Sequence, residues 1–211
     1  MDCGRERAMN TSPSPNELLN QARSGSSNHL GQLLELYRHY LSLLARIEIG
    51  RNLQAKLDAS DLVQDTLLEA HRNFPRFRGS SETQFVCWLR QIMAASLANL
   101  LRRYLGTQGR DVRLERDLAL HLDQSSRLLD RGLIAPISSP SQQASRREQV
   151  VLLADALELL PEDYRDVIVL RHLEGLSFGE VSQRMGRSLD SVEKLWVRGL
   201  ARLRQVMGGT P

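Results

Sequence analysis

Apolar side chains recur every three or four residues along most of this chain, and this spacing limits the fold more than any other feature. The clearest stripe consists of Leu30, Leu33, Leu34, Tyr37, Leu41, Leu44 and Ile47. A period near 3.6 residues places such side chains on one face of an α-helix. The spacing therefore predicts an amphipathic helix over 29–48, with its stripe against a core.

Helix-capping residues indicate where two further helices begin. Asp58 is a good N-cap for a helix that ends near Asn73, and Ser81 begins a capping box for a long helix to about Tyr104. The segment between these helices, 74–81, contains a Pro, a Gly and two aromatic residues, which indicates a loop.

Composition agrees with a helical fold. Val, Ile and Thr are sparse beside Leu, Ala, Arg, Glu and Gln, the residues that lose least free energy on entering a helix. Apolar residues make up 41% of the 211 residues, which is enough for a core in one or two compact domains. We therefore predict an all-α fold.

The helical pattern weakens between 106 and 139, and this break divides the chain in two. We expect a flexible linker there, with one helix near 113–129. Beyond it, Ser139 caps a helix to about Leu159, and Pro161 opens another that ends at Gly175. The predicted domains are a disordered tail at 1–15, a helical domain at 16–105, the linker at 106–139 and a second helical domain at 140–211.

Several classes of protein are disfavoured by what the sequence lacks. No apolar run approaches the ~20 residues that cross a bilayer, and the amino terminus has no apolar signal segment, so we expect a cytoplasmic protein without membrane contact. Cys3 and Cys87 form no CxxC pair, and the five histidines lack the spacing of a metal site. No P-loop, GxSxG, HExxH or GxGxxG motif is present. We expect no metal, no cofactor and no catalytic activity.

Arginine supplies nearly all of the positive charge. Of the 28 basic residues 26 are Arg, and the others are Lys56 and Lys194. Arg is the fork-shaped donor for phosphates and guanine edges, although a GC-rich genome also raises Arg content everywhere. Between 70 and 105 six Arg accompany a single acid, Glu82. This stretch is a candidate anion-binding surface.

The last two predicted helices form a helix-turn-helix pattern. Ser177 with Glu180 is a capping box for a short helix that ends at Gly186, and Ser188 caps a longer helix. One polar and basic edge of the longer helix carries Ser191, Lys194, Arg198 and Arg202. Such a helix enters the major groove, with its first residues at base edges and its later arginines at phosphates. The alternative is an ordinary helical hairpin with a solvated charged face, and Trp196 is expected in the core.

Two parts of the chain resemble the extracytoplasmic-function (ECF) sigma factors of bacterial RNA polymerase. Region two of that family is similar to DASDLVQDTLLEAHRNFPRFRG at 58–79 and FVCWLRQI at 85–92. Region four is similar to LLPEDYRDVIVLR at 159–171, EGLSFGEV at 174–181 and the helix from Ser188. The resemblance implies two small helical domains, a region 2 bundle and a region 4 helix-turn-helix, in the family's order.

The resemblance also implies a promoter-specificity subunit. It would bind core RNA polymerase at the clamp helices of the largest subunit and at the flap region, read promoter DNA at the minus-ten and minus-thirty-five elements, and assist melting. Core binding would use Asp61, Gln64 and Asp65, which without the flanking match would be interpreted as a solvated helix face. The minus-ten element would be bound by Phe77, Arg78, Ser80, Arg90, Asn99, Arg102 and Arg103. The minus-thirty-five element would be bound by Arg187, Ser188, Ser191, Lys194, Arg198 and Arg202.

Within the loop, the family holds a base flipped from the non-template strand, and Phe77, Arg78 and Ser80 are the available types for stacking and polar contacts. Phe74 and Phe85 are expected in the core instead. The sequence departs from the family at Ala95, where many members have Asn. It departs again in the recognition helix, where Glu193 to Trp196 replace the usual basic and small polar run, so no relative's minus-thirty-five preference can be carried over.

A second hypothesis is a two-domain transcription regulator. Its helix-turn-helix would bind an operator, and its amino-terminal domain would bind a small signal or dimerise. Such a protein would bind duplex DNA unaided and would not need the surface around Asp61 and Asp65. The residues do not specify the promoter sequence, the inducing signal or an anti-sigma partner, and the 106–139 linker either docks in the polymerase's RNA exit path or stays free.

Overall fold

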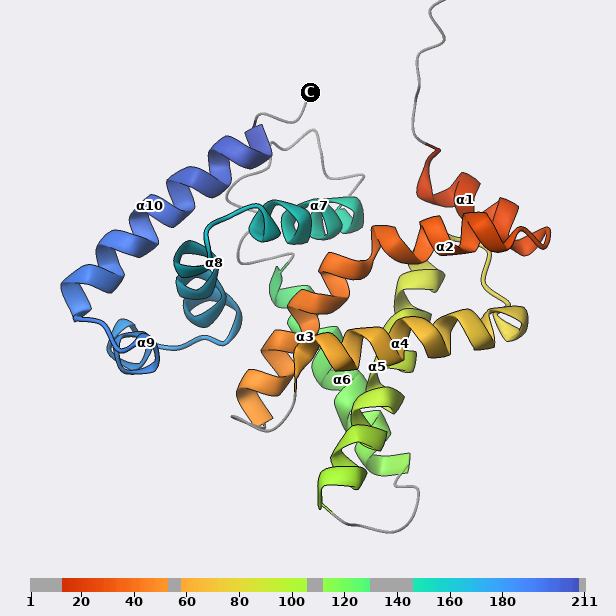
Figure 1. The fold of residues 1–211 in the computed structure, drawn as a ribbon, viewed down its shortest axis with the longest axis horizontal. Helices are drawn as coiled ribbons and strands as arrows, with labels where there is room; N and C mark the ends of the chain where they lie inside the picture. Colours follow the sequence, from red (N-terminus) through yellow and green to blue (C-terminus); the bar gives the residue numbers. More distant parts are fainter. Residues whose placement is uncertain (1–12, 53–57, 106–111, 130–145, 209–211) are drawn as a thin grey trace, which may run out of the picture.

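The computed structural model describes residues 13–52, 58–105, 112–129 and 146–208, and every regular element in these ranges is a helix (Figure 1). The prediction of an all-α fold is confirmed. In chain order the elements are α1 Pro15–Arg23, α2 Ser27–Leu36, α3 Arg38–Asn52, α4 Ala59–Asn73, the short η1 Phe74–Arg76, α5 Glu82–Leu105, α6 Val112–Leu129, α7 Arg146–Glu158, α8 Glu162–Ile168, η4 Val169–Leu173, α9 Phe178–Met185 and α10 Leu189–Gly208.

The amino-terminal helices form a bundle around α5, which packs against both α4 and α6. Four side chains of α5, each four residues from the next, are fully buried: Phe85, Leu89, Met93 and Leu97. Residues four apart lie on one face of a helix, so this row attaches α5 to the core along most of its length. The row fixes the position of the carboxy-terminal turns of α5, where several of the predicted DNA-binding residues lie.

The stripe predicted over 29–48 is buried throughout, but it belongs to two helices rather than one. Helices α2 and α3 are separated at Tyr37, whose N–H donates to the carbonyl of Leu34 at 3.2 Å in a tight turn. The Tyr37 ring lies 5.5 Å from that of Phe85, and its hydroxyl donates to Glu82 at 2.8 Å. The prediction of a single helix was wrong because these long-range contacts, which the local pattern does not contain, hold Tyr37 at the bend.

A helix from the predicted linker is part of the amino-terminal bundle. Helix α6 confirms the helix expected near 113–129, and it packs against α5 and α3. Its Leu118 and Leu122 are buried, and the hydroxyl of its Ser125 donates to the buried carboxylate of Glu48 at 2.9 Å. This part of the segment is therefore held in the bundle, while 106–111 and 130–139 lie outside the described residues.

The carboxy-terminal helices end in the predicted helix-turn-helix. The capping box is present, since the Ser177 hydroxyl accepts from the N–H of Glu180 and the Glu180 carboxylate accepts from the N–H of Ser177. Gly186 ends α9 in the left-handed conformation, at φ 62°. Helix α10 then passes close to α8 at Gly199, where a Cβ would lie 3.3 Å from the carbonyl oxygen of Tyr164. Glycine at this point allows the two helices to approach.

The helix predicted from Pro161 changes its winding before it ends. Its last residues form a π-helical turn, η4, in which the N–H of Glu174 donates to the carbonyl of Val169, five residues back, at 3.0 Å. Gly175 follows at φ 75°, as predicted for the end of this helix. The predicted start of the preceding helix at Ser139 lies outside the described residues.

Candidate functional site

The polar face of α4 carries the three residues predicted to bind the polymerase. Asp58 begins the helix, because its carboxylate accepts from the N–H of Ser60 at 2.8 Å. The opposite face is fixed in the core by Leu62, Val63, Thr66 and Ala70. Asp61, Gln64 and Asp65 consequently point away from the core, with Asp61 and Gln64 exposed and Asp65 half-buried.

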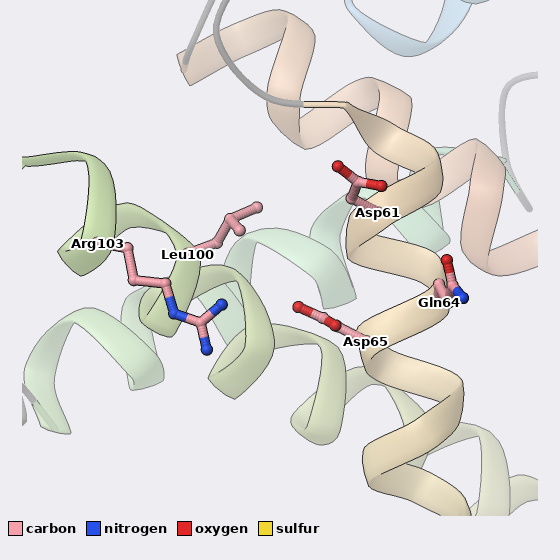
Figure 2. A pocket seen from close by; sticks show the side chains of 5 residues that line it. All are labelled: Asp61, Gln64, Asp65, Leu100 and Arg103. Carbon is pink, nitrogen blue, oxygen red and sulfur yellow. The ribbon is translucent and has the colours of Figure 1, made fainter.

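These side chains line an open hollow between α4 and the end of α5 (Figure 2). The hollow has a volume of about 520 Å³, and α5 contributes the buried Leu100 and the exposed Arg103 to its wall. In Figure 2 the carboxylate of Asp65 points across the hollow toward the guanidinium of Arg103. Arg103 was expected to bind the minus-ten element and the two carboxylates to bind the polymerase, and all three side chains line the same hollow.

The charged groups around this hollow are available to an external partner. In the part of the chain that the structure describes, the side chains of Asp61, Gln64, Asp65 and Arg103 make no hydrogen bond, and no ion pair within 4.0 Å joins them to another residue. The carboxylates of α4 and the guanidinium of Arg103 attract each other across the hollow even though they are not in contact. The hollow thus has an acidic wall and a basic wall that are separated by space for another side chain.

The loop between α4 and α5 is built on an aromatic cluster. Phe74, expected in the core, is buried, and so is Phe85. Phe77 is half-buried, and its ring centroid lies 5.9 Å from Phe74, 5.7 Å from Phe85 and 5.1 Å from Trp88. Gly79 covers this ring, since a Cβ on Gly79 would lie 2.3 Å from the end of the Phe77 ring.

The two polar residues of the loop lie outside this cluster. Arg78 and Ser80 are exposed, and Arg78 has no side-chain partner in the described chain. The backbone N–H of Ser80 donates to the side chain of Gln84 at 2.8 Å, while the Ser81 hydroxyl accepts from the N–H of Gln84. The loop therefore presents Arg78 and Ser80 to solvent on a support that includes Phe77.

At the end of α5, two of the predicted DNA-binding residues bond to each other. The guanidinium of Arg102 donates to the side-chain oxygen of Asn99, and it lies 3.7 Å from the carboxylate of Glu115 on α6. Arg102 is only 18% exposed, whereas Asn99 and Arg103 are exposed. Arg102 therefore positions Asn99, and Ala95 one turn earlier is half-buried.

Arg90 lies largely inside the bundle rather than on the exposed surface at the end of α5. Its guanidinium donates to Asp123 of α6 at 2.6 Å, to the hydroxyl of Tyr40 at 3.0 Å and to the sulfur of Cys87 at 3.2 Å. Only 13% of the side chain is exposed. This geometry does not support the prediction that Arg90 guides DNA phosphates, and the helix that engages its guanidinium, α6, was expected in a linker rather than in the bundle.

The edge of α10 carries the predicted minus-thirty-five residues. The hydroxyl of Ser188 accepts from the N–H of Ser191 and caps the helix, as predicted. Arg187, just before the cap, pairs with Asp163 of α8 at 2.7 Å. Lys194 pairs with Asp190 at 2.7 Å and is 64% exposed.

Farther along the same edge, the side chains are more freely available. Arg198 is exposed and has no partner in the described chain, and exposed Arg202 donates to Gln205 one turn on, at 3.1 Å. Figure 1 shows α10 along the outer edge of the molecule, with α9 at its amino-terminal end. This basic edge of the helix-turn-helix is therefore exposed at the surface of the molecule.

Trp196 lies on the inner side of α10, in agreement with the core expectation. Its indole N–H donates to Nε2 of His172 at 2.9 Å, and its ring lies 5.4 Å from that of Phe178 on α9. Arg171 stacks over the same Phe178 at 4.9 Å. Burial, and then the charge of Arg171, lower the pKa of His172 below its ordinary value. The cluster joins η4, α9 and α10.

Two family models match the chain. The model described as Sigma-70 region 2 matches residues 36–106, which contain α3, α4 and α5. The model described as Sigma-70, region 4 matches residues 151–203. The chain is 29% identical over 170 residues to the ECF RNA polymerase sigma-E factor of Escherichia coli strain K12, covering 80% of this chain and 81% of that protein.

Further similarity comes from another relative and from a solved structure. The ECF RNA polymerase sigma-E factor of Haemophilus influenzae is 28% identical over 169 residues, which cover 80% of this chain and 82% of that protein. The structure of CnrH in complex with the cytosolic domain of CnrY covers 93% of this chain and 99% of that chain, at 23% identity and a TM-score of 0.33.

Proposed function

This chain belongs to the ECF RNA polymerase sigma factors, with a region 2 domain followed by a region 4 domain, and we propose that α4, α5 and α10 carry its contacts with polymerase and promoter. The family is non-catalytic, so the chemistry of transcription stays in the polymerase. The protein acts in the cytoplasm, where it directs the enzyme to promoters. The domains we propose are 16–105, against which α6 packs, and 140–211.

The polymerase contact lies at the hollow between α4 and α5. The observation that carries this proposal is the lack of any side-chain partner for Asp61, Gln64 and Asp65 in the described chain. Unpaired carboxylates on one helix face suit a basic surface on a partner. We assign this face to the clamp helices of the largest polymerase subunit, and the flap region to the region 4 domain.

The minus-ten contact runs from the loop to the end of α5. Arg78 and Ser80 are the exposed polar groups that would hold an unstacked base, and Phe77 supports them from the aromatic cluster. Asn99 and Arg103 are exposed and would face DNA, with Arg102 bonded to the side chain of Asn99. Arg90 is not included, because its guanidinium is engaged inside the bundle.

The minus-thirty-five contact uses the basic edge of α10. Ser188 and Ser191 at the amino-terminal turn would face base edges, whereas Arg198 and Arg202 would face phosphates. Arg187 and Lys194 share this edge, and both would exchange an acidic partner of this chain for DNA. Because both domains are on one chain, binding of one domain raises the effective concentration of the other at its own promoter element. Two weak contacts therefore give specific binding together.

Co-elution with sigma-free bacterial core RNA polymerase tests this function. The Asp61→Ala/Asp65→Ala variant should fail to co-elute, because it lacks both carboxylates of the α4 face. A matched control, Asp117→Ala/Glu193→Ala, also removes two exposed carboxylates but leaves the hollow intact, and it should bind like the wild type. If the wild type does not bind core polymerase and instead shifts duplex DNA unaided, the two-domain regulator replaces this proposal.

A further inference from the structure

Helix α6 lies along α5 and is joined to it by ion pairs at two points (Figure 1). At one point Asp123 of α6 accepts from the guanidinium of Arg90 at 2.6 Å. At the other, the Glu115 carboxylate of α6 lies 3.7 Å from the guanidinium of Arg102. The two acids are about two helical turns apart on α6, and the leucines between them in the sequence are buried. Helix α6 therefore braces α5 up to its carboxy-terminal turns.

Arg102 connects Glu115 to a side chain that we expect to bind DNA. Its terminal nitrogen Nη2, which faces the Glu115 carboxylate, also donates to the side-chain oxygen of Asn99. Its Nε donates to the backbone carbonyl of Ala98 at 3.2 Å. Arg102 is 18% exposed and Glu115 is 16% exposed, so their attraction is screened less than that of a pair at the open surface. Because the guanidinium is planar and rigid, these contacts together fix its orientation.

The orientation of the Asn99 amide follows from the chemistry of Arg102. A guanidinium has five donors and no acceptor, so it faces the amide oxygen of Asn99 rather than the amide nitrogen. The NH2 group, with its two donors, is then the end of the amide directed away from the guanidinium. Since Asn99 is exposed, it presents hydrogen-bond donors to a partner at the end of α5.

An amide held in one orientation can discriminate between base edges. Guanine offers acceptors at N7 and O6, whereas the amino group of cytosine donates. An amide that is free to rotate can turn either its oxygen or its nitrogen toward a base and so tolerates both kinds of edge. Fixing the Asn99 amide by its oxygen therefore favours a base that offers an acceptor.

We propose that Glu115 is a positioning residue for the minus-ten contact, because it holds Arg102, which in turn holds the Asn99 amide with its NH2 group toward promoter DNA. This inference rests on the proposed function, in which Asn99 binds the minus-ten element. Glu115 acts through Arg102 and not on DNA directly, since a carboxylate repels phosphates. A residue of the segment expected to be a linker thus takes part in promoter reading.

Selection from a promoter pool tests this role in the full chain. Duplex fragments with randomised minus-ten and minus-thirty-five segments are mixed with sigma-free core polymerase and the protein, and the retained fragments are sequenced. The wild type should enrich one base at a minus-ten position, and Asn99→Ala should abolish that enrichment. Glu115→Gln keeps the shape of the side chain and removes its charge. It should reduce the enrichment at the same position about threefold to tenfold, the effect of one hydrogen bond.

Asp123→Asn is the matched control for the loss of an ion pair between α6 and α5. It neutralises the carboxylate that pairs with Arg90 rather than Arg102, so it should lower Tm and leave the base enrichment unchanged. A double variant separates positioning from general loosening. Once Asn99→Ala has removed the amide, Glu115→Gln should cause no further change in the selected bases. Equal loss of enrichment in Asp123→Asn and Glu115→Gln would overturn the positioning role.

The outcomes also separate this role from the proposed function. A wild-type chain that retains no promoter fragments together with core polymerase would overturn the proposed function, and the positioning role with it. A wild-type chain that selects a minus-ten sequence, but whose selection is the same in Glu115→Gln or survives Asn99→Ala, would overturn the positioning role and leave the function standing.

Discussion

Gly79→Ala should destabilise the region 2 domain, because the loop that presents Arg78 and Ser80 is closed over an aromatic ring. A Cβ at this position would lie 2.3 Å from Cζ of Phe77 and 2.9 Å from Cβ of Gln84. Backbone and ring cannot both stay in place at these distances, so Phe77 must leave part of its contact with the cluster.

The size of the effect follows from the contacts at risk. Each aromatic pair contributes about 0.5–1.5 kcal/mol beyond buried area, and forcing an extra carbon into a packed site typically costs ~1–3 kcal/mol. Loss of glycine's freedom in the unfolded chain offsets up to about 1 kcal/mol. We expect a net loss of about 1–2 kcal/mol, which lowers Tm by about 2–8 °C in a protein of this size.

Thermal unfolding followed by circular dichroism measures this change. The matched control is Gly31→Ala on α2, where a Cβ would meet no atom within 4 Å. Because alanine is the better helix former by roughly 0.5–1 kcal/mol, the control should unfold at a higher temperature than the wild type. If Gly79→Ala raised Tm in the same way as Gly31→Ala, the close packing of Phe77 beneath the loop would be refuted.

Two further predictions concern groups inside the fold. Arg90→Met should lower the free energy of unfolding by about 1–3 kcal/mol, because Asp123 and the Tyr40 hydroxyl lose a charged donor, and an unchanged urea midpoint would show that the network contributes nothing. The pKa of His172 in the folded state lies below its ordinary value, so the folded protein favours the neutral imidazole. The resulting stabilisation is fully present above about pH 6.5 and is lost as the pH falls through the lowered pKa. The urea midpoint should therefore fall on acidification more in the wild type than in His172→Gln, in which the Trp196 N–H keeps an acceptor, and parallel pH profiles would contradict this.

Features of the fold that depend on neighbouring residues could be predicted from the sequence. The cap at Asp58, the capping box of Ser177 and the left-handed turn at Gly186 each involve atoms within a few residues, and each is present in the structure. One local signal was missed, the capping box at Ser14 that begins α1, although Glu17 stands at the right distance. Hydrogen bonds between residues a few positions apart can be predicted from the sequence, because the residue types that form them recur at fixed spacings.

Features that depend on distant segments could not be predicted in this way. The bend at Tyr37 depends on Phe85 and Glu82, and the inward turn of Arg90 depends on α6, whose docking has no local signature. The hollow between α4 and α5 likewise combines a feature that the local sequence predicts with one that it does not. The exposed face of α4 follows from the period of its apolar residues, but the approach of Arg103 to that face is a property of how α4 and α5 pack.

The direction of the helix-turn-helix relative to α8 depends on the number of residues in the π-helical turn η4 rather than on their side chains. A wide turn holds one residue more than an α-helical turn, and one residue rotates everything after it by about 100° around the helix axis. This extra residue sets the phase in which His172 meets Trp196 and Arg171 meets Phe178. Deleting a single residue within Val169–Leu173 would therefore aim α9 and α10 in a new direction relative to α8, even though every side chain on the basic edge of α10 would be unchanged.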